Sequence, residues 1–256
     1  VVRMKQGKRL SEYRKTVFKA VVGMIVFSYG VLILTNKSTL NQLVSRNYPV
    51  QGVDVSHYQG KIDGERFREQ QVYFAFIKAT EGSSHTDEYF ADNWEKAKVA
   101  GIATGAYHFF SFDSPASAQA EHYIETVGDL SGRIIPVVDV EYYGNKKQNP
   151  PDVREVQKNL DEMLTILEHY YGYKPMIYTT YSFYQEYIMG MFEDHPLWLR
   201  NVYYPPIDIG RKWQFWQYSD QGKLEGMSGP EPCIDFNVFV GGFEDFRDYV
   251  VEGIQD

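Results

Sequence analysis

Cysteine is nearly absent from this chain, since Cys233 is the only one among 256 residues. No disulfide can therefore form within the chain, and cysteine pairing does not reveal the redox compartment, so export remains possible. Cys233 stands at the start of an apolar run and lacks a local catalytic signature. We expect a small packed thiol at this position rather than a nucleophile.

Patterns for metal and nucleotide binding are also missing. The six histidines form neither an HExxH motif nor an i, i+4 pair, and the chain has no GxGxxG or phosphate-binding loop. The run DVSH (54–57) brings an aspartate, a serine and a histidine together. Neighbours on one strand point to alternate faces, however, and cannot form a catalytic triad. We therefore expect no metal and no cofactor.

Acidic residues outnumber basic residues after the first fifth of the chain. Residues 1–50 contain 9 basic residues and 1 acidic one, whereas residues 51–256 contain 17 and 33, giving formal charges of +8 and −16. Because phosphate binding needs a basic face, the acidic body argues against nucleic acid as a partner. A neutral or cationic ligand fits it better.

The basic N-terminal part leads into a run without charge, AVVGMIVFSYGVLILT (20–35). With the preceding residues from 17 onward, and with Lys19 reaching the interface, its length suffices to cross a bilayer. We therefore predict a membrane anchor at 17–35. A cleaved signal peptide is the alternative, although NKSTLNQL offers no small-residue cleavage site. A buried core helix is disfavoured because the run shows no amphipathic face.

This anchor divides the chain into parts. The basic residues before it predict a cytoplasmic tail at 1–16, and the positive-inside rule then puts everything after it on the exported side. Residues 36–50 are expected to be a short polar stalk, and residues 51–256 the folded body.

The body alternates apolar, β-rich runs with stretches that suit helices, which is typical of a parallel sheet with crossover helices. The candidate strands are 52–55, 73–79, 103–110, 134–141, 174–180, 197–200, 214–219 and 233–239. Three intervening stretches carry helix signals, such as Pro-Pro-Asp at the start or glycine at the end, whereas the last three strands leave little room for helices. We predict an α/β fold: a TIM-like barrel of eight strands with about five helices, (β/α)5(β)3.

Acidic residues mark several of the predicted strands. Asp139 and Glu141 follow the buried run IIPVV, and as residues i and i+2 of a strand they share a face. Two crowded carboxyl groups raise one pKa, which suits the acid and carboxylate roles of glycoside hydrolysis. The alternative is a helix cap or an ion pair with Lys78. Because Asp54 and Asp235 also lie on predicted strands, and reactive groups of such barrels lie at strand C-termini, we expect all four acids at one rim.

Aromatic residues make up 16% of the chain. Most are expected in the core. Tyr107, Tyr178 and Trp216 lie near the C-terminal ends of predicted strands, where they are candidates either for the core or for stacking on sugar rings.

The ordered motifs of the body resemble those of the family 25 glycoside hydrolases, the Ch-type lysozymes. The resemblance covers nearly all of residues 51–241 and rests on GVDVSHYQG, AFIKATEG, GAYHFF, VVDVE, MIYT, PLWL, FWQYSDQG and IDFNVF. It implies cleavage of the β-1,4 bond between N-acetylmuramic acid and N-acetylglucosamine in peptidoglycan. Many members of that family are secreted, whereas the anchor predicted here puts this protein in a bacterial cytoplasmic membrane with its body periplasmic or extracellular.

The resemblance also implies roles for individual residues. Glu141 is similar to the family's general acid/base, and Asp139 to its assisting carboxylate, either orienting the 2-acetamido group of the substrate or stabilising positive charge. Asp54 and Asp235 match the two remaining rim acids, and Tyr107, Trp216 and Gln217 match subsite contacts. Two other functions remain open: a glycan-binding barrel without activity, and a hydrolase of another N-acetylated glycan such as chitin. The oligomeric state is not predicted.

Overall fold

A computed structural model describes residues 15–25, 28 and 39–252 of the chain. Residues 15–25 are helical. None of the helices in these described ranges is long and apolar enough to cross a membrane. The anchor predicted at 17–35 includes residues 26–27 and 29–35, which lie outside the described residues, as does most of the predicted tail, so both stay predictions.

Eight strands close into a barrel, as predicted. They are β1 (Gln51–Val55), β2 (Phe74–Glu81), β4 (Ala103–Phe109), β5 (Val137–Asp139), β6 (Met176–Thr180), β7 (Leu197–Arg200), β8 (Phe215–Gly222) and β9 (Ile234–Phe239). The barrel closes because β1 pairs with β2 on one side and with β9 on the other. A ninth, two-residue strand, β3 (His85–Thr86), extends the end of β2.

The direction of β9 differs from the prediction. All neighbours from β1 through β2, β4, β5, β6 and β7 to β8 run parallel, but β9 is antiparallel to both β8 and β1. Asp235 therefore lies at the beginning of its strand rather than at its C-terminal end. Because the strand is reversed, Asp235 still reaches the same rim as the other acids, directly opposite Asp54.

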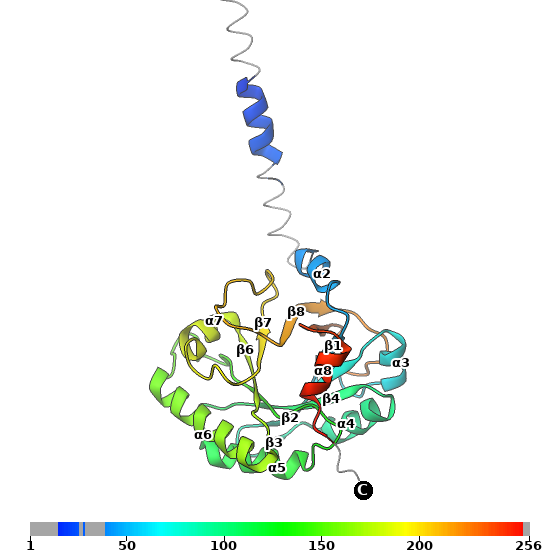
Figure 1. Cartoon of the computed structure of the whole chain (residues 1–256), viewed down its shortest axis with the longest axis vertical. Helices are drawn as coiled ribbons and strands as arrows, with labels where there is room; N and C mark the ends of the chain where they lie inside the picture. Colours follow the sequence, from blue (N-terminus) through cyan, green and yellow to red (C-terminus); the bar gives the residue numbers. More distant parts are fainter. Residues whose placement is uncertain (1–14, 26–27, 29–38, 253–256) are drawn as a thin grey trace, which may run out of the picture.

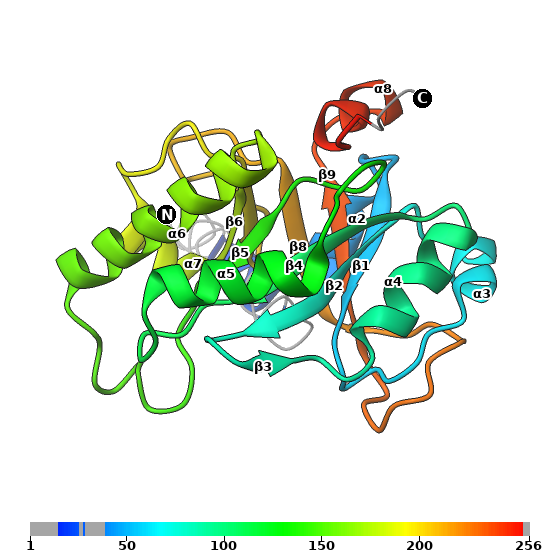
Figure 2. The same ribbon diagram turned by 90° about the horizontal axis from the view of Figure 1, so that it is seen from below.

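Five helical connections cover the first part of the barrel, also as predicted (Figure 1). They are α3 (Gly64–Glu69), α4 (Phe90–Val99), α5 (Ala116–Val127), α6 (Val153–Tyr171) and α7 (Tyr181–Phe183), which continues as a π-helical turn at Tyr184–Ile188. Figure 2 shows α4, α5 and α6 on the outside of the barrel. No helix separates β7, β8 and β9 in this described stretch; α8 (Phe243–Phe246) and a 3-10 turn at Arg247–Tyr249 follow the last strand.

Local sequence explains the bounds of the longest helix. Asp152 caps the start of α6, where its carboxylate accepts hydrogen bonds from the backbone N–H groups of Arg154 and Glu155. Gly172 ends the helix in the left-handed conformation, with φ of 75°. Between these ends the apolar residues recur at helical spacing and are buried against the barrel.

The described part of the predicted stalk belongs to the folded body. Residues 39–45 form helix α2 (Thr39–Ser45), which packs against β8 (Figure 1). The buried Asn41 side chain donates hydrogen bonds of 3.0 Å to the backbone oxygens of Asn201 and Tyr218. Val50 is fully buried. Among the described residues, the segment from Thr39 onward is thus part of the packed structure.

Aromatic rings fill the lower part of the barrel, and glycine makes room for them. Phe76 stacks on Trp198 with ring centroids 4.1 Å apart, and Phe215 meets Phe76 edge to face. Gly105 on β4 faces this cluster, and a Cβ there would lie 2.6 Å from the Phe76 ring. A side chain at this position would therefore displace a ring that has no free space around it.

We predict that Gly105→Ala destabilises the fold by about 1 to 3 kcal/mol, because the added methyl group overpacks the ring cluster. Urea denaturation followed by circular dichroism measures the change. Gly242→Ala is the matched control: its Cβ would meet only the Asp245 carboxylate, at 3.7 Å. Equal stability of the two variants would contradict the packing argument.

Candidate active site

A layer of polar side chains lies above the aromatic rings, at the rim formed by the C-terminal ends of the parallel strands. Strand register sets this layer: Asp54 is opposite Asp235, and Gln217 lies between Arg200 and Asn237. Asp139 on β5 is level with Tyr178 on β6, and Glu141 follows two residues later. All four predicted acids, with Tyr178 and Gln217, therefore belong to one end of the barrel.

Two amide side chains hold Asp54 and Asp235 together. Gln217 Nε2 donates to Asp54 Oδ2 at 2.8 Å and to Asp235 Oδ2 at 2.9 Å. Asn237 Nδ2 donates a further hydrogen bond of 2.7 Å to Asp54 Oδ2. A single carboxylate oxygen of Asp54 thus accepts from two amides, and one of those amides bridges to the second acid.

The orientation of both amides is fixed by buried donors behind them. Tyr178 donates its hydroxyl proton to Gln217 Oε1 at 2.9 Å, which turns the amide nitrogen toward the acids. Trp198 Nε1 does the same for Asn237, donating to Oδ1 at 2.8 Å. Because an amide whose oxygen is engaged must present its nitrogen elsewhere, these two contacts preorganise the cluster.

Burial changes the protonation of this pair. Desolvation raises the pKa of Asp54 to about 6, although hydrogen bonds from Asn237 and Gln217 oppose the rise. Desolvation, followed by the negative charge of Asp54, raises the pKa of Asp235 to about 9. At neutral pH the two carboxyl groups together therefore retain about one proton.

The second pair of acids is also shifted upward. Desolvation, and then the nearby charge of Glu141, raises the pKa of Asp139 well above its ordinary value. Desolvation raises the pKa of Glu141 to about 7, while the positive charge of Arg200 opposes the rise. Asp139 Oδ1 is buried and has no hydrogen-bond partner within the described chain. Lys78 forms its 2.6 Å ion pair with Glu81, not with either acid.

The predicted aromatic contacts divide between the two faces of the barrel wall. Tyr107 and Tyr178 lie on the inner face and pack against Trp198, with only 9% and 6% of their surfaces exposed. Trp216 points outward, fully buried against Tyr48 and Trp213. The structure therefore does not bring Trp216 to the acids, although it places its neighbour Gln217 among them.

Sequence reasoning did not assign Trp198 or Asn237 to this rim, and it considered Lys78 only as a possible ion-pair partner of the acids. Strand alternation could have found two of them, because Asn237 is two residues from Asp235 and Trp198 is two residues before Arg200. Strand alternation also predicts that Trp216 and Gln217, as neighbours on β8, point to opposite faces of the barrel wall. Arg200 completes the rim, and its guanidinium pairs with Asp220 at 2.8 Å.

Comparisons with known proteins identify the family to which the chain is similar. The family described as Glycosyl hydrolases family 25 matches residues 53–227. Lysozyme M1 of Streptomyces globisporus is 35% identical over 209 residues, covering 75% of this chain and 68% of that protein. The uncharacterized protein YegX of Escherichia coli K12 is 36% identical over 219 residues, covering 83% and 77%. A family 25 glycosyl hydrolase from Bacillus anthracis is 45% identical in its solved structure, with a TM-score of 0.76 and coverage of 80% and 95%.

We predict that the free energy of unfolding falls as the pH rises from 7 to 9. The unfolded chain has lost its aspartate protons in this window, whereas folded Asp235, with a pKa of about 9, keeps one. The folded state binds more protons, so stability is lost as the pH rises through the folded pKa, by at most about 1.4 kcal/mol per pH unit for one proton. Urea denaturation at several pH values measures the slope.

The variant Asp235→Asn replaces the protonated acid with a neutral amide, so its stability should depend less on pH across the same window. Asp161→Asn, on the exposed face of α6, is the matched control and should keep the wild-type slope. A slope in Asp235→Asn as steep as that of the wild type would show that another group causes the effect.

Proposed function

Because this chain belongs to glycosyl hydrolase family 25 and is a glycoside hydrolase, we propose that it cleaves the β-1,4 bond between N-acetylmuramic acid and N-acetylglucosamine in peptidoglycan. The observation that carries the proposal is the gathering of four carboxyl groups with raised pKa values at one end of the barrel. Glycoside hydrolysis needs one protonated and one ionised carboxyl group beside the scissile bond.

Glu141 is the proposed general acid/base. A pKa of about 7 leaves a large fraction of Glu141 protonated near neutral pH, so that it can protonate the leaving oxygen and then remove a proton from water. In the described chain no hydrogen bond engages its carboxyl group, which leaves it free to meet a substrate. The charge of Asp54 helps to hold the proton on Glu141, and Arg200 limits the shift.

Asp139 is the proposed assisting carboxyl group. It lies two residues before Glu141 on the same face, and no side-chain hydrogen bond of the described chain engages its carboxyl group, which could accept one from a substrate amide N–H. Holding the 2-acetamido group in this way would aim the acetamido oxygen at the anomeric carbon. We expect net retention of configuration from such a mechanism. The cluster of Asp54, Asp235, Gln217 and Asn237 then holds the sugar and sets the charge around the pair.

The alternative of a glycan-binding barrel without activity is not favoured by the site. A barrel that only binds sugar has no need to keep two acids in the adjacent, desolvated positions where a proton stays available near neutral pH. A chitin hydrolase could use the same carboxyl groups, so the substrate has to be tested directly.

We also propose that the N-terminal region anchors the enzyme in a bacterial cytoplasmic membrane, with the barrel periplasmic or extracellular. The support is the charge-free run at 20–35 and the basic residues before it. Peptidoglycan lies on that side of the membrane, so the proposed location and the proposed substrate agree.

We predict that Glu141→Gln lowers the rate of reducing-end release from purified peptidoglycan by about a hundredfold or more, because the amide cannot donate or accept the catalytic proton. Glu125→Gln, on the exposed face of α5, is the matched control and should keep full activity. Circular dichroism checks that both variants fold. Undiminished activity of Glu141→Gln would show that Glu141 is not the general acid/base. Equal activity of the wild-type enzyme on chitin oligomers would show that its substrate is not specifically peptidoglycan.

We predict that the full-length chain sediments with membranes after expression in bacteria, whereas a chain beginning at Thr39 stays in the soluble fraction. Starting at Thr39 preserves α2 and its contacts with β8, so the comparison changes only the N-terminal region. Recovery of a shortened, soluble protein from the full-length gene would instead indicate a cleaved signal peptide.

A further inference from the structure

A pocket of about 380 Å³ opens beside the acids, at the C-terminal ends of β6 and β7. It is lined by Tyr142, Lys147, Thr180, Tyr181, Ser182, Arg200, Asn201, Val202, Tyr203 and Tyr204. Arg200 belongs to both this pocket and the catalytic rim, where its charge acts on Glu141. Tyr142 directly follows Glu141 in the chain. The pocket is therefore an extension of the proposed active site, and its volume is in the range of ligand-binding clefts.

The lining contains two cations and no acid, in a body whose formal charge is −16. Lys147 is exposed and forms no ion pair within the described chain. The neighbouring Lys146 behaves differently, because its ammonium group binds Asp113 at 2.6 Å and so ties down the turn that presents Lys147. Arg200 uses Nη2 for Asp220, and its side chain keeps 29% of its surface exposed.

Acids close to the pocket are already engaged by its residues. Tyr181 donates its hydroxyl proton to Asp208 at 2.7 Å, and Tyr142 donates to Glu186 at 2.5 Å. Neither acid lines the pocket, and neither does Asp220. These hydrogen bonds hold the two tyrosine rings in place, so the walls are aromatic and fixed while the cations supply the charge.

We propose that this pocket binds the carboxylate-bearing peptide that branches from the lactyl group of N-acetylmuramic acid, with Lys147 and Arg200 pairing with its carboxylates. The inference rests on the proposed function, because only a muramic acid glycan carries such a peptide beside the scissile bond. A neutral glycan such as chitin offers nothing for two cations to pair with. The tyrosines supply the apolar and hydrogen-bonding surface that a short peptide needs.

The test compares two substrates: solubilised glycan strands that keep their peptides, and the same strands after an amidase has removed the peptides and the lactyl carboxylate thereby freed has been capped as a methylamide. Lys147→Glu should lower kcat/KM on the peptide-bearing strands by about three- to tenfold, the size expected when an exposed ion pair becomes repulsive. Lys147→Ala should lower it less. Neither variant should change kcat/KM on the peptide-free strands.

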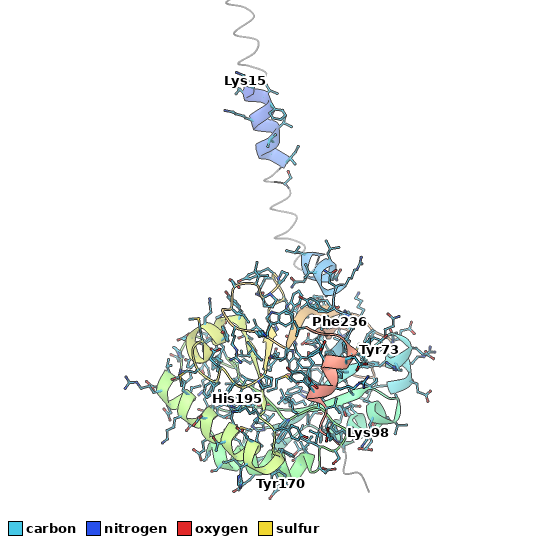
Figure 3. All side chains as sticks on the ribbon, viewed as in Figure 1. Lys15, Tyr73, Lys98, Tyr170, His195 and Phe236 are labelled. Carbon is cyan, nitrogen blue, oxygen red and sulfur yellow. The ribbon has the colours of Figure 1, made fainter. Side chains whose placement is uncertain are left out.

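Lys98→Glu is the matched control, because Lys98 is an exposed lysine on α4, outside the barrel (Figure 3). It makes the same change in net charge and should leave both substrates unaffected. The loss in Lys147→Glu should also shrink when the ionic strength is raised, since salt screens an exposed pair.

Equal losses on the two substrates, or no loss on either, would overturn the peptide-binding proposal while leaving the hydrolase proposal intact. A wild-type enzyme that cleaves neither substrate would instead overturn the proposed function itself, and the peptide pocket with it. A loss in Lys98→Glu as large as that in Lys147→Glu would assign the effect to net charge rather than to this pocket.

Discussion

Closure of the barrel through β9 is the constraint on which the site depends. β1 must pair on both edges, and the chain achieves this by returning β9 antiparallel between β8 and β1. The reversed strand places Asp235 directly opposite Asp54, in a register that parallel pairing would not give. The same strand brings Asn237 beside Gln217. β9 thus supplies both an acid, Asp235, and an amide, Asn237, that donates a hydrogen bond to Asp54.

Desolvation raises the pKa values of these carboxyl groups. In every one of the four acids, burial is the largest cause of the raised pKa, and like charges add to it for Asp139, Glu141 and Asp235. The opposing influences are hydrogen bonds from Gln217 and Asn237 to Asp54 and the positive charges of Arg200 and Lys78. Arg200 acts on both pairs, whereas the amides act on Asp54 and Lys78 acts on Asp139 and Glu141. The pairs therefore titrate differently, which is what separate acid and carboxylate roles require.

Much of this arrangement could be predicted from the sequence, because apolar runs and helix signals report local structure. The eight strands, the five helical connections and the positions of Asp54, Asp139, Glu141 and Asp235 at one rim all follow from such patterns. The direction of β9 could not be predicted, since apolar and polar residues alternate in the same way in parallel and antiparallel strands. The hydrogen bonds from Tyr178 and Trp198 to the two amides join residues 39 positions apart, and no local pattern encodes them.

Arg200 connects Glu141 to the neighbouring pocket. Its guanidinium lowers the pKa of Glu141 from one side and lines the pocket from the other, while Asp220 holds one end of it. A carboxylate bound in the pocket would offset part of this positive charge. The pKa of Glu141 would then rise, and more of the acid would be protonated when a peptide-bearing strand is bound than when the site is empty. If the pocket binds the peptide as proposed, peptide recognition and the protonation of Glu141 would be coupled through Arg200.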